Sequence, residues 1–227
     1  MKRRISLIGL MSLIGLAGAL FSHAQTVSPP PTLVLTWQAH AYVPSDYPGK
    51  ILPPRGSSVD VSLLATDRGK IIDLSRTDIA WSVNGRHLNG GIGMTYFSFV
   101  LDQFTARTYT ITASIRDWQG LPNMETSVAI RRADPMIVID APYSKHLLTD
   151  QSAELTVIPY FFLINTVSDL TVSWEVNNKD INQQVNKLLL GILNASAGQT
   201  ITVQSEAVNN NNAVESAADT QTFIVAQ

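Results

Sequence analysis

Histidines are the side chains best suited to acid–base or metal chemistry near neutral pH, and this sequence keeps them apart. Beyond the first 24 residues, His40, His87 and His146 form no His-x-His or His-x-x-x-His pair. Histidines that bind one metal from the same element share a short spacing of this kind. We therefore expect surface histidines rather than metal ligands.

Motifs for covalent catalysis or phosphate binding do not accompany the histidines. The chain has no Cys and no Gly-x-Ser-x-Gly elbow. Gly90, Gly91 and Gly93 are not followed by the Lys-Ser/Thr of a phosphate-binding loop, and we interpret them as part of a hairpin loop. The sequence predicts no catalytic residue and no enzyme, and a small hydrolase is the least favoured class of function.

Three carboxylates near the middle of the chain raise the question of calcium, which prefers oxygen ligands. Asp134, Asp140 and Asp150 form no Asp-x-Asp or Asp-x-Asn run. We interpret them as solvated loop acids. No cofactor is expected, and an inter-domain Ca²⁺ stays an unsupported alternative.

Loop aromatics are the residues with the best claim to recognition. Tyr42 and Tyr47 lie in a proline-rich stretch, and Trp118 lies in a predicted turn. Exposed aromatic rings stack on sugars or anchor protein interfaces. We name these three as candidate ligand contacts, with packing into the core as the alternative.

Two other tryptophans reveal the elements that must carry these residues. Residues 79–85 and 172–178 share one pattern, in which apolar residues alternate around Trp81 or Trp174 and the run ends at Asn-Gly or Asn-Asn. The two tryptophans are 93 residues apart. The pattern predicts a half-buried strand that runs into a turn, with the Trp in the core.

Further segments repeat in the same order at similar offsets. We match Phe99 to Ile192 at an offset of 93, and Ile111 to either Ile201 or Val203. The remaining matches are Val59, Val61 and Leu63 with Ala153, Leu155 and Val157 at 94, and Val128 and Ile130 with Phe223 and Val225 at 95. In and just before residues 187–193, helical spacing relates Val185, Leu188, Leu189 and Ile192, but the counterpart of this segment at 96–101 has the character of a strand. We therefore predict a strand there, with a short helix as the alternative.

These patterns predict an all-β protein of two tandem antiparallel immunoglobulin-like sandwiches. The expected divisions are an N-terminal signal peptide or anchor in 1–24, a proline-rich linker in 25–32, and sandwiches in 33–134 and 135–227. We place the boundary at Asp134-Pro135, because a residue before proline is disfavoured in helices.

The first unit combines Trp81-Ser82-Val83-Asn84-Gly85 with the strand around Tyr109 and the later Gly120. In these residues it resembles the polycystic-kidney-disease (PKD) repeat and related immunoglobulin-like modules of bacterial surface proteins, with Arg107 where the family usually has Gly. The second unit keeps Trp174 and Asn177 but not the Tyr. The resemblance implies a β-sandwich in which Trp81, Trp174 and Tyr109 are structural core residues, and it carries over no binding site.

The N-terminus predicts export. Lys2-Arg3-Arg4 precedes an apolar segment, residues 5–21, and Ser22-His23-Ala24 places small residues where a signal peptidase cleaves. The alternative is an uncleaved anchor formed by residues 5–21, which would be the protein's only contact with a membrane. Without the three basic leader residues the net charge of −2 becomes −5, which argues against nucleic acid as a partner.

The favoured hypothesis is a non-catalytic, exported cell-surface or periplasmic protein that acts as a structural, adhesion or protein-interaction module. The alternative is a carbohydrate-binding accessory protein that uses Tyr42, Tyr47 or Trp118. Either hypothesis implies a protein or glycan partner at the cell surface, which the sequence does not identify.

Overall fold

The computed structural model describes residues 31–101, 106–116, 123–141, 143–149, 152–182, 185–192 and 194–226. The predicted leader, most of the proline-rich linker, Trp118 and Asp150 lie outside these residues. Residues 31–227 form one compact unit, so the boundary at Asp134-Pro135 stays a prediction.

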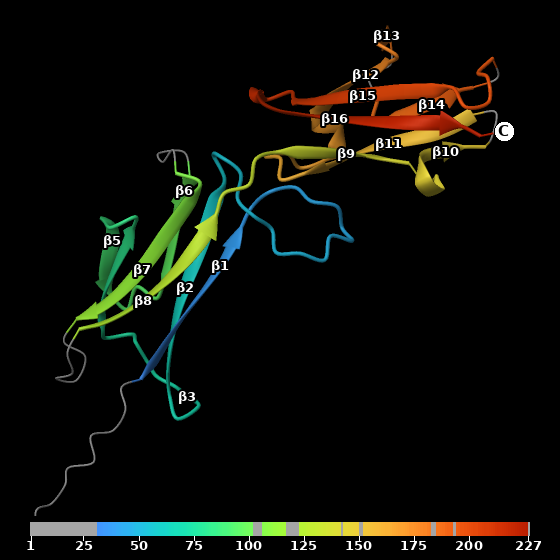
Figure 1. Ribbon diagram of the computed structural model, residues 1–227. Coiled ribbons are helices and arrows are strands. Elements are labelled where there is room, and N and C mark those ends of the chain that lie inside the picture. Colours follow the sequence, from blue (N-terminus) through green and yellow to red (C-terminus); the bar gives the residue numbers. More distant parts are fainter. Residues whose placement is uncertain are drawn as a thin grey trace, which may run out of the picture. The chain divides into compact units, whose positions relative to one another are not determined.

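The first half of the described chain consists of two antiparallel sheets (Figure 1). One sheet has the order β1–β2–β3, with β6 also paired to β2, and the other has the order β5–β4–β7–β8. The strands are β1 (Thr32–Ala39), β2 (Ser58–Asp67), β3 (Lys70–Ile71), β4 (Asp78–Val83), β5 (Arg86–Ile92), β6 (Tyr96–Val100), β7 (Thr108–Arg116) and β8 (Met124–Arg131).

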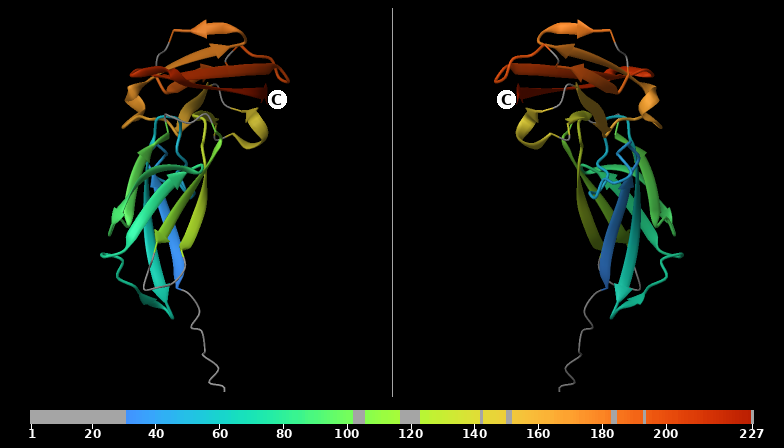
Figure 2. Two further views of the ribbon diagram at one scale, coloured as in Figure 1. Left: turned by 90° about the vertical axis from the view of Figure 1, so that its left-hand side faces the viewer. Right: turned by 90° about the vertical axis from the view of Figure 1, so that its right-hand side faces the viewer.

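The second half also consists of two sheets. Its strands are those coloured yellow to red in Figure 2. One sheet has the order β14–β11–β9, and the other has the order β10–β16–β15–β12–β13. The elements are β9 (Met136–Asp140), η2 (Ser144–His146), β10 (Leu147–Leu148), β11 (Ser152–Tyr160), η3 (Val167–Asp169), β12 (Leu170–Val176), β13 (Lys179–Ile181), β14 (Lys187–Gly191), β15 (Thr200–Asn209) and β16 (Asn212–Val225). Only the short β10–β16 pair among these strands is parallel.

The strand order defines an immunoglobulin-like fold. β1, β2 and β6 share one sheet in the first half, and β9, β11 and β14 share one in the second. They correspond to strands A, B and E of an immunoglobulin domain. The remaining strands follow the order C′-C-F-G: β5–β4–β7–β8 in the first half and β13–β12–β15–β16 in the second. The prediction of an all-β, immunoglobulin-like sandwich fold is therefore confirmed.

Each half has its own cluster of buried apolar side chains, as alternation on half-buried strands requires. Trp81, Tyr109 and Trp174 belong to these clusters, with exposed fractions of 0%, 0% and 1%. In the first cluster the ring of Trp81 stacks on Phe97, which in turn stacks on Phe99.

The repeated Trp-x-x-Asn motif makes the same polar contacts in both halves. The indole Nε1 of Trp81 donates to the backbone carbonyl of Met94, and that of Trp174 donates to Val185, each at 2.8 Å. These bonds satisfy the one polar atom that each indole carries into the core. The motif therefore has a structural role in each half.

The asparagines of the motif extend the pairing of the Trp strand beyond its end. The Asn84 backbone N–H donates to the Thr110 carbonyl at 2.8 Å, and its Oδ1 accepts the Thr110 N–H at 2.8 Å. Asn177 makes both bonds with Thr202, at 2.8 and 2.9 Å. Asn84 and Asn177 have φ values of 51° and 50°, in the left-handed region that asparagine tolerates better than most residues.

The register of β6 and β14 corrects one predicted match between the halves. Val59 pairs with Phe99, whereas Ala153, the counterpart of Val59, pairs with Leu190. Phe99 therefore corresponds to Leu190 and not to Ile192. The hairpin before β14 is shorter, because β13 has 3 residues and β5 has 7. The prediction of a strand for 187–193, rather than a helix, is confirmed over Lys187–Gly191.

The register of the last strand pairs corrects a second match and decides an open one. Val83 pairs with Ile111 and Val176 with Val203, so Ile111 corresponds to Val203 rather than to Ile201. The next pairings are Tyr109 with Ile130 in the first half and Ile201 with Phe223 in the second. Phe223 therefore corresponds to Ile130 and not to Val128, and Val225 loses its predicted match with Ile130.

Candidate ligand-binding site

The loop aromatics named as candidate contacts are partly engaged within the protein. Tyr42 is half-buried, and its backbone N–H donates to the Phe162 carbonyl while its carbonyl accepts from the Phe161 N–H, both at 2.7 Å. Tyr47 is half-buried too, and its ring packs edge-on against Tyr160 and Phe161, with ring centroids 5.9 and 5.8 Å away. Packing against other rings leaves less of the Tyr47 surface free for a ligand. Trp118 lies outside the described residues.

The carboxylates considered for calcium have ordinary surroundings where the structure describes them. Asp134 is exposed and lies 3.3 Å from the guanidinium of Arg132, and Asp140 is exposed at the end of β9. Within the described residues no group of three or more His, Cys, Asp or Glu is arranged to hold a metal ion.

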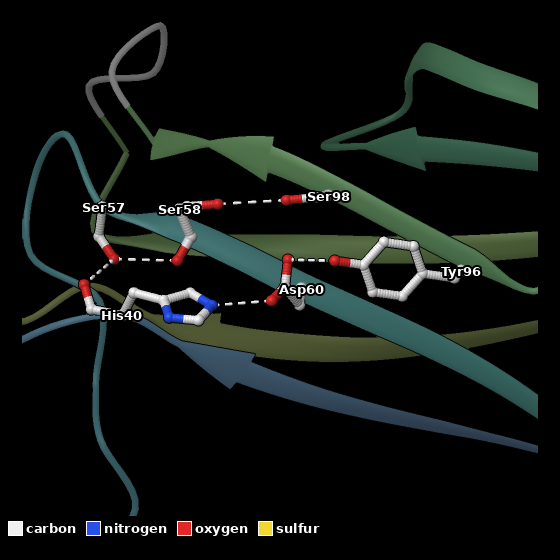
Figure 3. Close-up of polar contacts among 6 residues, drawn as sticks. All are labelled: His40, Ser57, Ser58, Asp60, Tyr96 and Ser98. Atoms are coloured by element: carbon white, nitrogen blue, oxygen red, sulfur yellow. Dashed lines mark hydrogen bonds and ion pairs between the residues drawn. The ribbon is translucent and has the colours of Figure 1, made fainter.

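One histidine does have a carboxylate partner, in a group of side chains that we call the Asp60 cluster. Its members are His40, Ser57, Ser58, Asp60, Tyr96 and Ser98 (Figure 3). Figure 3 shows the carboxylate of Asp60 between the imidazole of His40 and the phenol of Tyr96. His40 Nε2 lies 2.7 Å from Asp60 Oδ2, and the Tyr96 hydroxyl donates to Oδ1 at 2.6 Å.

Strand register places Ser58, Asp60, Tyr96 and Ser98 together on the outer face of the β1–β2–β6 sheet, whereas Ser57 is buried. Val59 and Val61 of β2 are fully buried, so Asp60 between them points outward. Asp60 lies opposite Ser98 on β6 and opposite Gln38 on β1. His40 directly follows β1, and its side chain is 56% exposed, against 28% for Asp60.

Hydrogen bonds to Asp60 control its protonation. The bond from Tyr96, followed by those from His40 and Ser98, lowers the pKa of the Asp60 carboxyl to about 2. The same bond to Asp60 raises the pKa of the Tyr96 phenol. At neutral pH the pair is therefore a neutral phenol that donates to an ionised carboxylate.

The geometry of the cluster is unsuited to nucleophilic catalysis. A serine nucleophile needs its hydroxyl within hydrogen-bond reach of the histidine ring. The Ser57 hydroxyl instead makes its bonds to backbone carbonyls, at 2.9 Å to His40 and 3.1 Å to Ser58. What the cluster offers is an exposed ring beside hydrogen-bonding groups on an open sheet face.

Sequence reasoning missed this cluster because its members are far apart along the chain. Asp60 is 20 residues from His40 and 36 from Tyr96. The alternation of 58–65 predicts that Asp60 faces outward, which was the available signal. The pairing of β1 with β2 was not available, since the long segment 40–57 between them fixes no register.

Comparisons with known proteins add a general likeness only. No family model matches the sequence, and no curated protein matches it. Among solved structures, the three N-terminal domains of the Highly Immunogenic Outer Capsid protein of bacteriophage RB49 are similar at 10% identity, with a TM-score of 0.45 over 86% of this chain. This chain covers 59% of that structure.

Two further similar structures come from bacteria. The fibronectin(III)-like modules of Clostridium thermocellum CbhA have 13% identity and a TM-score of 0.29, over 86% of this chain and 95% of theirs. A Bacteroides ovatus glucan-utilisation protein, SGBP-B, solved with a mixed-linkage heptasaccharide, has 10% identity and a TM-score of 0.27, over 84% of this chain and 48% of its own. Such likeness says nothing about function, and the immunoglobulin-like assignment rests on the strand order.

The part of the chain that the structure describes contains no helix with the length and hydropathy to cross a membrane.

Proposed function

We propose that this protein is a non-catalytic, exported module of the cell surface or periplasm that acts by adhesion or protein interaction. The observation that carries the proposal is the Asp60 cluster, which presents polar groups on an open sheet face while its buried serine, Ser57, bonds to backbone carbonyls. An open face of this kind suits a binding partner better than a reacting substrate.

Export is part of the proposal and rests on the N-terminal sequence. The basic residues 2–4, the apolar segment 5–21 and the small residues before Gln25 support a cleaved leader or an anchor. The absence of Cys agrees with a protein whose stability comes from packed cores, even in an oxidising compartment.

The test is accessibility on intact cells that produce the full chain. Protease added outside, or inside the periplasm after the outer membrane is opened, should digest the protein while a cytosolic marker stays intact. A chain protected until the cytoplasm is released would overturn the proposal.

A second candidate function is glycan binding. The loop residues Tyr42, Tyr47 and Trp118 suggested it from the sequence, but the rings of Tyr47, Tyr160 and Phe161 pack on one another. The exposed ring of Tyr96 beside Asp60 favours a different surface for the same class of ligand.

A further inference from the structure

We propose that the outer face of the β1–β2–β6 sheet binds an uncharged glycan, with Tyr96 as the stacking ring and Asp60 as the central hydrogen-bond acceptor. The inference rests on the proposed function, because it names a surface and a ligand class for that binding module.

Two rows of side chains cross this face at right angles to the strands. The first row is Gln38, Asp60 and Ser98, and the second is Thr36, Ser62 and Tyr96. From ordinary strand geometry each row spans about 10 Å and the rows lie about 7 Å apart. The surface therefore has room for a short oligosaccharide lying flat.

The side chains in these rows match the chemistry of a sugar. The ring of Tyr96 is 54% exposed and offers an apolar face to the C–H groups of a pyranose. Asp60 Oδ1 accepts from Tyr96, Oδ2 lies 2.7 Å from His40 Nε2, and Ser98 is a further partner; a carboxylate has about four acceptor positions, so capacity for a sugar hydroxyl is left. Serine and threonine hydroxyls and the Gln38 amide can both donate and accept.

The arrangement is also fixed before a ligand arrives. The Tyr96 phenol is held at 2.6 Å by Asp60, and Ser98 lies 3.1 Å from Ser58. A side chain that is already ordered loses little conformational entropy on binding. This reduces the cost of using a small, flat surface.

Charge selects an uncharged glycan over an acidic one. Asp60 is the only charged residue in the two rows and is ionised at neutral pH. Neither row supplies a Lys or Arg to pair with a uronate or phosphate. An acidic sugar would meet the like charge of Asp60, which costs binding energy.

The second half of the molecule shows that the fold itself does not require this chemistry. Glu154 stands where Asp60 does, since Asp60 pairs with Ser98 and Glu154 pairs with Leu189. The counterpart of Tyr96 is Lys187, and its Nζ lies 2.6 Å from Glu154, with both side chains more than half exposed. Exposed pairs of this kind are ordinary features of a solvated surface. The equivalent sheet of the second half therefore has an ion pair where the first half has a tyrosine hydrogen-bonded to a carboxylate.

The test is calorimetric titration of the purified full chain with neutral hexasaccharides of glucose, mannose, galactose and xylose, and with a galacturonate hexasaccharide. At least one neutral sugar should bind, and the galacturonate should not. Tyr96→Ala should weaken binding about 10-fold or more, and Asp60→Asn should weaken it as well. Tyr96→Phe keeps the ring and should retain more affinity than Tyr96→Ala.

Lys187→Ala in the second half is the matched control and should leave affinity unchanged. The inference is wrong if no neutral sugar binds, if only the galacturonate binds, or if binding survives Tyr96→Ala and Asp60→Asn. Because Tyr96 lies on the surface, its variants should remain folded. Their unfolding midpoints, measured alongside, check that they do. Failure of this test leaves the accessibility of the chain on intact cells untouched, so the two proposals fail separately.

Discussion

At the scale of single residues, Trp81 and Trp174 combine the largest buried side chains with one satisfied polar atom each. Truncating either to alanine should lower the free energy of unfolding by about 3–5 kcal/mol, because the change leaves a cavity. Substitution by phenylalanine should cost less, because it retains most of the packing. Its remaining cost comes from the backbone carbonyl that loses the indole donor. Urea unfolding of the full chain measures both changes, and an unchanged midpoint for Trp81→Ala would exclude the core assignment.

Asp60 makes a prediction about pH at the same scale. Its pKa is about 2 in the folded protein and about 4 in an unfolded chain. A carboxyl with a lowered folded pKa contributes stability above pH of about 4 and loses that contribution as the pH falls toward 2. The difference in unfolding midpoint between the wild-type protein and Asp60→Asn should therefore shrink over this interval. A difference that stays constant down to pH 2 would contradict the hydrogen bonds described for Asp60.

At the scale of elements, the turn after each Trp strand provides a matched pair of variants. Gly85 and Asn178 occupy equivalent positions with φ values of 77° and 62°, and two consecutive positive φ values favour Asn-Gly. Asn178→Gly should stabilise the protein by a few tenths to about 1 kcal/mol, and Gly85→Asn should destabilise it by a similar amount. A Cβ at position 85 would meet no atom within 4 Å, so the effect is purely conformational. Equal midpoints for the two variants would show that the turns are not equivalent.

A buried carboxylate on β16, Glu215, leads to a second prediction about the β15–β16 hairpin. Glu215 is 6% exposed and accepts from the Leu163 N–H at 2.7 Å and from the Asn209 amide at 2.5 Å. Glu215→Gln should cost about 1–3 kcal/mol, because one acceptor becomes a donor facing a donor. Glu206→Gln, on the exposed face of β15, is the control and should change the unfolding free energy little. Equal effects of the two variants would contradict the hydrogen bonds described for Glu215.

At the scale of the whole molecule, the repeat in the sequence was sufficient to predict the fold class and the strand character of 187–191. It misplaced Phe99 and Ile130 relative to their counterparts by two residues. A shift of two residues along a strand keeps each side chain on the same face, so apolar alternation cannot detect it. Hydrogen-bond register alone resolves such a slip.

The candidate site was harder to predict than the fold for a related reason. Asp60 becomes distinctive only when β1 and β6 flank β2 and bring His40 and Tyr96 to it. Tyr42 and Tyr47 were predicted as ligand contacts because aromatic rings in proline-rich loops are expected to be exposed. Tyr47 instead packs against Tyr160 and Phe161, contacts between segments that no local pattern connects.

The two halves share one scaffold, and the glycan-binding face is proposed for the first half alone. Amide NMR spectra of the isotope-labelled full chain, recorded with the neutral hexasaccharide that binds most tightly, locate the contact surface residue by residue. We expect shift changes in β1, β2 and β6 around Gln38, Asp60 and Ser98, and none in β9, β11 or β14. Changes confined to the loop around Tyr42 and Tyr47, or to the sheet that holds Glu154, would contradict the proposed binding face.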